Sequence, residues 1–191
     1  MRVLCVVLLM LMLPLSGCLG SDGAAVQTTG DTVDEVSGAC TAPAEATTQN
    51  MTAVLVDGVE RQYRLTVPAA DAGVALPIII AFHGGGGAEE DFPQQNEFDA
   101  LAQEERFIMA YAMAEDDRTS AEGEWFLNTA ATSREDNDFA EAIVDALDEL
   151  YCIDDTRLYA IGYSLGSMFT YEVACQLNHR FAAVASFAGT M

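Results

Sequence analysis

Residues 157–166 of the sequence read RLYAIGYSLG, an apolar run that passes directly into a Gly-x-Ser-x-Gly pattern centred on Ser164. A stretch with helical character, residues 168–178, follows at once. Glycines two residues before and after a serine permit a sharp turn from strand to helix, which lifts the hydroxyl onto the edge of a sheet. This context predicts a nucleophile at Ser164. The alternative is an ordinary connection in which the serine only caps the helix. Residues 162–166 are called the serine turn below.

A second glycine-rich segment, residues 83–87, follows the apolar run at residues 77–82. It consists of His83, Gly84, Gly85, Gly86 and Gly87 and is called the glycine loop below. Consecutive glycines let backbone N–H groups approach a substrate without side-chain clash. We expect the N–H groups of Leu165 and Gly85 to form an oxyanion hole, with His83 shaping the loop and not acting as a base. A phosphate loop is disfavoured, because no Gly-Lys-Ser/Thr follows and residues 89–91 are acidic.

Strand and helix patterns alternate through the rest of the sequence. Continuous apolar runs predict buried strands at residues 77–82, 107–111, 157–161 and 181–187, and residues 53–56 and 61–67 predict a hairpin around Asp57-Gly58. Helical spacing predicts helices near residues 98–102 and along the stripe Phe139, Ile143, Leu147 and Leu150, the latter capped by Asp138. The predicted class is α/β, with a mostly parallel central sheet and helices on both faces.

The charge of the chain is strongly acidic. Its 191 residues include 30 acidic residues and 8 basic ones, and the net charge is -22 at pH 7. Nucleic acid and anionic membrane surfaces would repel such a chain, so neither is expected as a partner. Adaptation to high salt and a compositional bias toward arginine both account for the absence of lysine, and the sequence does not separate them.

The N-terminal residues predict export. Residues 1–17 have the short positive start and apolar core of a signal peptide, and Leu15-Ser16-Gly17-Cys18 resembles a lipoprotein processing box. We expect acylation at Cys18, which would anchor the protein to an extracytoplasmic membrane face. A plain secretory signal and an uncleaved anchor remain alternatives. Residues 18–50 are expected to form an acidic, flexible tether, and residues 51–191 the catalytic domain.

Several motifs in order resemble the polyhydroxybutyrate depolymerase/feruloyl esterase group of α/β-hydrolases. The resemblance rests on residues 57–64, 77–87, 151–175 and 181–189, together with Trp125. It implies an α/β-hydrolase fold and a Ser-Asp-His triad that cleaves a polyester, feruloyl or acetyl ester through an acyl-enzyme on Ser164. The sequence departs from the group at Ala112-Met113, where a proline is usual, and at Ser167, where a further glycine is usual.

Two cysteines flank the serine turn. Cys152 precedes the strand, and Cys175 lies eleven residues after Ser164 on the helix. The strand from residue 157 to 163 climbs roughly 20 Å and the helix descends roughly 16 Å. In an exported protein these lengths favour a Cys152–Cys175 disulfide over two free thiols.

The remaining triad members are not evident. In this fold the acid and the histidine follow the serine, yet only 27 of the 191 residues follow Ser164. His83 lies upstream and His179 ends the following helix, so we expect the acid and the base to lie beyond Met191. The alternatives are a non-catalytic surface lipoprotein, and a peptidase or acyltransferase on the same scaffold. No cofactor is expected, and the histidines and carboxylates show no metal-ligand spacing, so no metal site is expected either.

Overall fold

A computed structural model of the chain describes residues 43–86, 92, 95–115, 125–127 and 134–189. Its strands are β1 Thr47–Val56, β2 Val59–Val67, β3 Leu76–Phe82, β4 Ile108–Ala112, β5 Ile153–Tyr163 and β6 Ala183–Phe187. Its helices are α1 Gln95–Glu105, α2 Glu135–Leu150 and α3 Leu165–Gln176. The expected signal peptide, the acylation site Cys18 and most of the expected tether lie outside the described residues. β1 begins at Thr47, and not at the expected domain boundary at residue 51.

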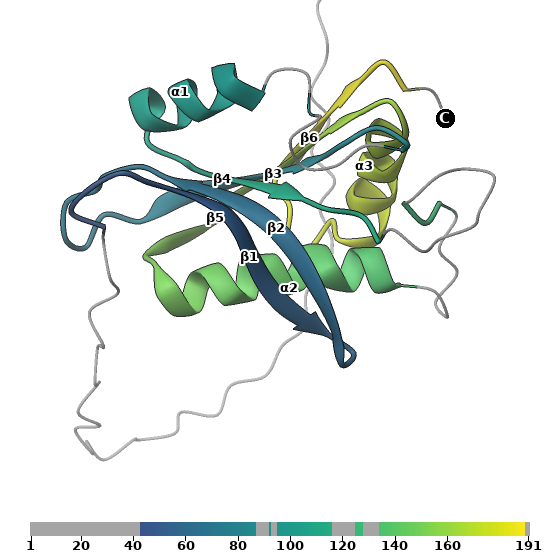
Figure 1. Cartoon of the computed structure of the whole chain (residues 1–191), viewed down its shortest axis with the longest axis horizontal. Helices are drawn as coiled ribbons and strands as arrows, with labels where there is room; N and C mark the ends of the chain where they lie inside the picture. The colour runs from purple at the N-terminus through teal and green to yellow at the C-terminus, as the bar shows by residue number, and fades with distance from the viewer. Residues whose placement is uncertain (1–42, 87–91, 93–94, 116–124, 128–133, 190–191) are drawn as a thin grey trace, which may run out of the picture. The chain divides into compact units, whose positions relative to one another are not determined.

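The strands form one mixed sheet in the order β1-β2-β4-β3-β5-β6 (Figure 1). β3 pairs in parallel with both β4 and β5, and β5 pairs in parallel with β6. The hairpin β1–β2 is antiparallel and joins the sheet through β4. β3 and β4 are largely or fully buried on both faces, as a parallel sheet between helices requires. β6, which was predicted to be buried, is instead partly exposed, because it lies at the edge of the described sheet. The predicted α/β class with a mostly parallel sheet is therefore confirmed.

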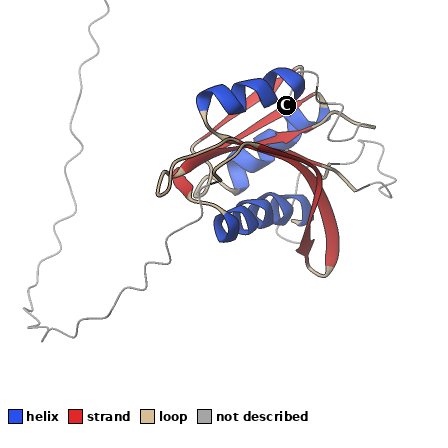
Figure 2. Ribbon diagram, turned by 60° about the vertical axis from the view of Figure 1, so that its left-hand side comes forward, coloured by secondary structure: helices blue, strands red, loops and turns tan. Residues whose placement is uncertain are grey.

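Helices cover both faces of the sheet, as predicted. α1 lies on one side, and α2 lies on the other (Figures 1 and 2). The larger core cluster joins alternate sheet residues such as Ile80 and Ala110 to Phe139 of α2 and Phe169 of α3. The smaller cluster joins the intervening strand residues, which point to the opposite face of the sheet, to Ala102 of α1; Met109 of β4 is one of them. The alternation of side chains along each strand thus divides the core between the two layers.

Two details of the predicted elements are wrong. Asp138 does not cap α2, because the helix begins at Glu135 and its cap residue is Arg134. Asp138 instead lies in the first turn and accepts a hydrogen bond from the Nε of Arg134 at 3.1 Å. Leu150 does not join the buried stripe, since it ends the helix with 54% of its surface exposed. The predicted hairpin turn is confirmed, with Asp57 and Gly58 both at positive φ.

The predicted Cys152–Cys175 disulfide is also wrong. Cys152 is buried and disulfide-bonded, but Cys175 is an exposed free thiol. α3 buries Phe169 and Val173, and Cys175 lies two residues after Val173, rotated by about 200° around the helix axis. The path lengths suggested by the sequence were compatible with a bridge, but the phase of the helix turns the thiol away from the sheet.

No helix among the described residues is long and apolar enough to cross a membrane.

Tyr63 of β2 carries a hydroxyl that is buried without a hydrogen-bond partner. Burial, with a smaller contribution from Tyr151, raises its pKa from 10.0 to about 12. Ionisation of this phenol is therefore disfavoured in the folded state, so the stability of the fold is unaffected by ionisation below pH 10 and falls as the pH rises toward 12. We expect Tyr63→Phe to raise the free energy of unfolding by about 1 kcal/mol at pH 8, because it removes an unsatisfied polar group. It should also reduce the loss of stability between pH 10 and 12. Urea unfolding at both pH values tests this, and a less stable variant at pH 8 would contradict it.

Candidate functional site

The serine turn connects β5 to α3. Ser164 has φ 52° and ψ -114°, a region that side-chain-bearing residues rarely occupy. Its N–H donates to the carbonyl of Phe187 at the end of β6, at 2.9 Å. Its carbonyl accepts hydrogen bonds from the N–H groups of Ser167 and Met168 at the start of α3. These bonds hold the strained backbone in place, and the serine side chain is half-buried.

Both glycines of the turn are required by close backbone contacts. A Cβ added to Gly162 would lie 2.1 Å from the carbonyl oxygen of Gly166. A Cβ added to Gly166 would lie 2.1 Å from the carbonyl oxygen of Phe82. The absence of side chains thus lets β5, α3 and the end of β3 approach one another, and this approach brings the serine turn against the glycine loop.

The glycine loop lies directly beside Ser164. A Cβ on Gly84 would be 3.3 Å from the Cβ of Ser164, and one on Gly85 would be 3.4 Å from Cδ2 of Leu165. Leu165 is the first residue of α3, so its N–H has no acceptor within the helix. Gly86 has φ 70° and open space around it, and Gly87 lies outside the described residues. The structure thus brings together Ser164, Leu165 and Gly85, while the oxyanion role of the two N–H groups stays a prediction.

His83 is buried and held by backbone groups. Its Nε2 accepts a hydrogen bond from the N–H of Ala114 at 3.1 Å, so the ring proton is on Nδ1. That Nδ1 lies 2.7 Å from the carbonyl oxygen of Gly84 and donates to it. The carbonyl of His83 accepts from the indole N–H of Trp125 at 2.9 Å. Because both ring nitrogens are engaged, neither can take a proton from Ser164, which supports a loop-shaping role.

His179 is not placed to act on Ser164 either. It is exposed, and its Nε2 lies 3.5 Å from a carboxylate oxygen of Glu141. His179 follows the C-terminal end of α3, whereas Ser164 precedes its N-terminal end, so the two residues lie at opposite ends of the helix. Neither histidine of the chain therefore serves as a base for the serine.

Comparisons with known proteins identify this arrangement. No protein-family model matches the chain. The sequence is 34% identical over 147 residues to NocK of Nocardia uniformis subsp. tsuyamanensis, which is named as an esterase, over 72% of this chain and 40% of NocK. It is 27% identical over 140 residues to a protein of Aspergillus terreus named feruloyl esterase C, over 71% of this chain and 50% of that protein. The chain thus spans half or less of the length of these relatives.

The solved structure of a ferulic acid esterase from Anaeromyces mucronatus superimposes with a TM-score of 0.56 at 15% identity. The match covers 85% of this chain and 61% of that structure. The chain has the α/β-hydrolase fold. Within this fold, Ser164 occupies the turn after β5, and the glycine loop follows the neighbouring parallel strand β3.

One buried ion pair near the candidate site was not predicted from the sequence. Arg61 of β2 and Asp136 of α2 form an ion pair at 3.0 Å with side-chain exposures of 3% and 0%. Arg61 lies on the face of β2 that is turned toward α2. Every second residue of the strand shares that face, including Tyr63 and Leu65. A charged residue at an inward-facing strand position could have indicated a buried ion pair. The same residue is equally compatible with the polar start of a hairpin.

Among the described residues of the fold, no group of three or more His, Cys, Asp or Glu side chains is arranged to hold a metal ion.

Proposed function

We propose that this chain carries the nucleophile and oxyanion elements of a serine carboxylic-ester hydrolase. The observation that carries the proposal is the backbone of Ser164, which is strained at φ 52° and lies against Gly84, while Gly85 lies against the next residue, Leu165. Strain of this kind costs about 1–3 kcal/mol and persists where surrounding structure enforces it, commonly at active sites. A serine that only capped α3 would accept hydrogen bonds through its side chain, and none is made here.

The proposed reaction begins with attack of the Ser164 hydroxyl oxygen on the ester carbonyl carbon. The N–H groups of Leu165 and Gly85 stabilise the negative charge that develops on the carbonyl oxygen. The intermediate then expels the alcohol, leaving an acyl group on Ser164 that water removes. A base must take the serine proton and deliver it to the alcohol. Neither His83 nor His179 is placed to act as this base.

The substrate class is proposed from the relatives and the surroundings of Ser164. The names of the Aspergillus terreus relative and of the superimposed structure point to feruloyl esters, and the motif resemblance adds acetyl and polyester substrates. Tyr163 and Phe187 are exposed register partners at the ends of β5 and β6. Tyr163 directly precedes Ser164, and the carbonyl of Phe187 accepts the Ser164 N–H. Exposed aromatic rings beside the nucleophile support an aromatic acyl group such as feruloyl.

Labelling with a fluorophosphonate tests the proposed mechanism. In the full-length protein, we expect covalent modification at Ser164, identified by mass spectrometry of the peptide that contains residues 158–180. Ser167 and Ser186 lie nearby and serve as internal controls that should stay unmodified. Methyl ferulate, an aryl acetate and polyhydroxybutyrate would then rank the substrate classes. Failure to label Ser164 would contradict the esterase proposal and favour a non-catalytic surface lipoprotein.

We also propose that the protein is anchored outside the cytoplasm through an acylated Cys18. The processing box at residues 15–18 supports this. In the native host, we expect fatty-acid labelling and membrane association of the wild-type protein, and loss of both in Cys18→Ala. Cys175→Ala is the matched control, because that exposed thiol is far from the processing box in sequence. Membrane association that survives Cys18→Ala would contradict the lipid anchor.

A further inference from the structure

The ion pair between Arg61 and Asp136 is buried at a position where apolar packing would be the simpler solution. The guanidinium of Arg61 stacks 4.2 Å above the ring of Phe139, and the carboxylate of Asp136 is fully buried. Burying two charges costs free energy, and apolar side chains of similar size often stabilise a core equally well. The pair therefore calls for a role other than stability.

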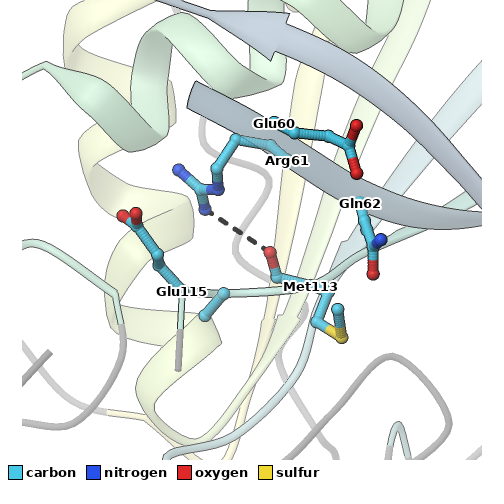
Figure 3. A pocket seen from close by; sticks show the side chains of 6 residues that line it. Glu60, Arg61, Gln62, Met113 and Glu115 are labelled. Carbon is cyan, nitrogen blue, oxygen red and sulfur yellow. Dashed lines mark hydrogen bonds between the residues drawn. The ribbon is translucent and has the colours of Figure 1, made fainter. Parts of the chain in front are cut away.

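Each member of the pair holds one of the two segments that contact His83. Arg61 donates from Nη2 to the carbonyl of Met113 at 3.4 Å (Figure 3). The next residue, Ala114, donates its N–H to Nε2 of His83. On the other side, Asp136 accepts from the N–H of Phe126 at 2.7 Å.

Trp125, the residue before Phe126, makes the contact between this second segment and His83. Trp125 donates its indole N–H to the carbonyl of His83 and lies against its ring, with 5.1 Å between ring centroids. His83 is thus held from two sides by segments that converge on one ion pair.

His83 transmits this constraint to the proposed oxyanion hole through a single peptide group. Its Nδ1–H donates to the carbonyl of Gly84, and that carbonyl shares a planar trans peptide with the N–H of Gly85. Fixing the direction of the Gly84 carbonyl therefore fixes the opposite direction of the Gly85 N–H. Gly85 packs against Leu165, the other proposed donor.

We infer that the Arg61–Asp136 ion pair positions the Gly85 N–H for oxyanion stabilisation, acting through Met113–Ala114, Trp125–Phe126 and His83. The inference rests on the proposed esterase function. Arg61 and Asp136 do not touch the substrate in this scheme and are positioning residues. Their effect is expected in the transition state, where the oxyanion forms, and not in substrate binding.

The same strand supplies a matched control. Arg64 of β2 pairs with Asp99 of α1 at 2.6 Å on the other face of the sheet. Asp99 also accepts hydrogen bonds from Thr66 and Tyr111. None of these four residues belongs to the glycine loop or the serine turn. Asp99→Asn and Asp136→Asn therefore remove the same charge from two helix-to-strand ion pairs, only one of which leads to His83.

The experiment measures kcat, KM and Tm of both variants in the full-length protein, with a soluble aryl ester. We expect Asp136→Asn to lower kcat by about 10- to 100-fold with KM changed less than about threefold, as for a weakened oxyanion donor. Asp99→Asn should lower Tm but leave kcat within about twofold of the wild type. Equal effects of the two variants on kcat would overturn the inference.

A double variant separates positioning from stability. Arg61→Met combined with Asp136→Leu removes both buried charges, so Tm should recover toward the wild-type value. Because the hydrogen bonds to the Met113 carbonyl and from the Phe126 N–H are then lost, kcat should stay low. Recovery of kcat together with Tm would show that the pair is only structural. This variant also covers the case in which Asp136→Asn does not fold.

A second readout distinguishes this inference from the proposed function. In ¹⁵N NMR spectra, the imidazole of His83 should show one tautomer, protonated on Nδ1, in the wild type and in Asp99→Asn. Asp136→Asn should give a mixture of tautomers, because the Ala114 and Trp125 contacts loosen. If the wild type neither hydrolyses esters nor labels at Ser164, the proposed function fails, and an unchanged tautomer in Asp136→Asn would separately overturn the positioning.

Discussion

Replacing Ser164 with glycine is expected to make the full-length protein more stable and inactive at once. Ser164 has φ 52° and ψ -114°, where a side chain is strained and glycine is not. Relief of that strain should raise the free energy of unfolding by about 1 kcal/mol, after the greater chain entropy of unfolded glycine is subtracted. Loss of the nucleophile should lower kcat by about 10⁴-fold or more.

Ser164→Ala is the control that isolates the backbone contribution. Alanine lacks the hydroxyl but keeps a Cβ, so it should lose the same activity without gaining stability. Urea unfolding and ester hydrolysis of both variants provide the measurements. A glycine variant no more stable than the alanine variant would show that the turn is not strained. A kcat reduced less than tenfold would show that Ser164 is not the nucleophile.

The second large effect is expected from Gly166→Ala. The added Cβ would lie 2.1 Å from the carbonyl oxygen of Phe82 and 2.4 Å from that of His83. Both neighbours are backbone atoms, so no side chain can rotate away to relieve the contact. The end of β3 and the start of α3 must separate, which should cost about 3 kcal/mol or more and misplace the oxyanion donors. A displacement of about 1 Å at such a site lowers the rate by about 100-fold.

Gly73→Ala gives the matched comparison for an added methyl group. Gly73 has φ 79°, and a Cβ added there would have no atom within 4 Å, so only backbone strain of about 1–2 kcal/mol is expected. Its activity should stay close to that of the wild type once the protein is folded. Thermal unfolding and kcat of the two variants test the contrast. A Gly166→Ala protein as stable and active as Gly73→Ala would contradict the close approach of β3 and α3.

The local features of the site were predictable because they depend on short-range sequence. The apolar runs before His83 and Gly162 predicted buried strands of a mostly parallel sheet, and the glycines predicted a sharp turn and an open loop. The structure adds that the two strands are direct neighbours. Both patterns act within a few residues of the chain, where backbone sterics decide the outcome. The resemblance to esterases added the order of these motifs and therefore the fold.

The features that were missed depend on long-range packing or on helix phase. Arg61 is buried only because Asp136, 75 positions later, reaches it from α2. Cys175 is exposed because of its angle around α3, which path lengths alone do not give. Asp138 resembled a cap in sequence, but α2 starts three residues earlier, at Glu135. A pattern within one element could not have settled any of these three.

The hydrogen bond from Ser164 to Phe187 also constrains the order in which the molecule can be assembled during synthesis. The ribosome makes the serine before it makes β6, whose last carbonyl accepts the Ser164 N–H. Gly189, which lies against the Ser164 carbonyl, is made later still. A nascent chain that ends at the serine therefore has neither contact to enforce the strained conformation. The reactive geometry should arise only after β6 has emerged, so that partly made chains carry an unformed serine turn.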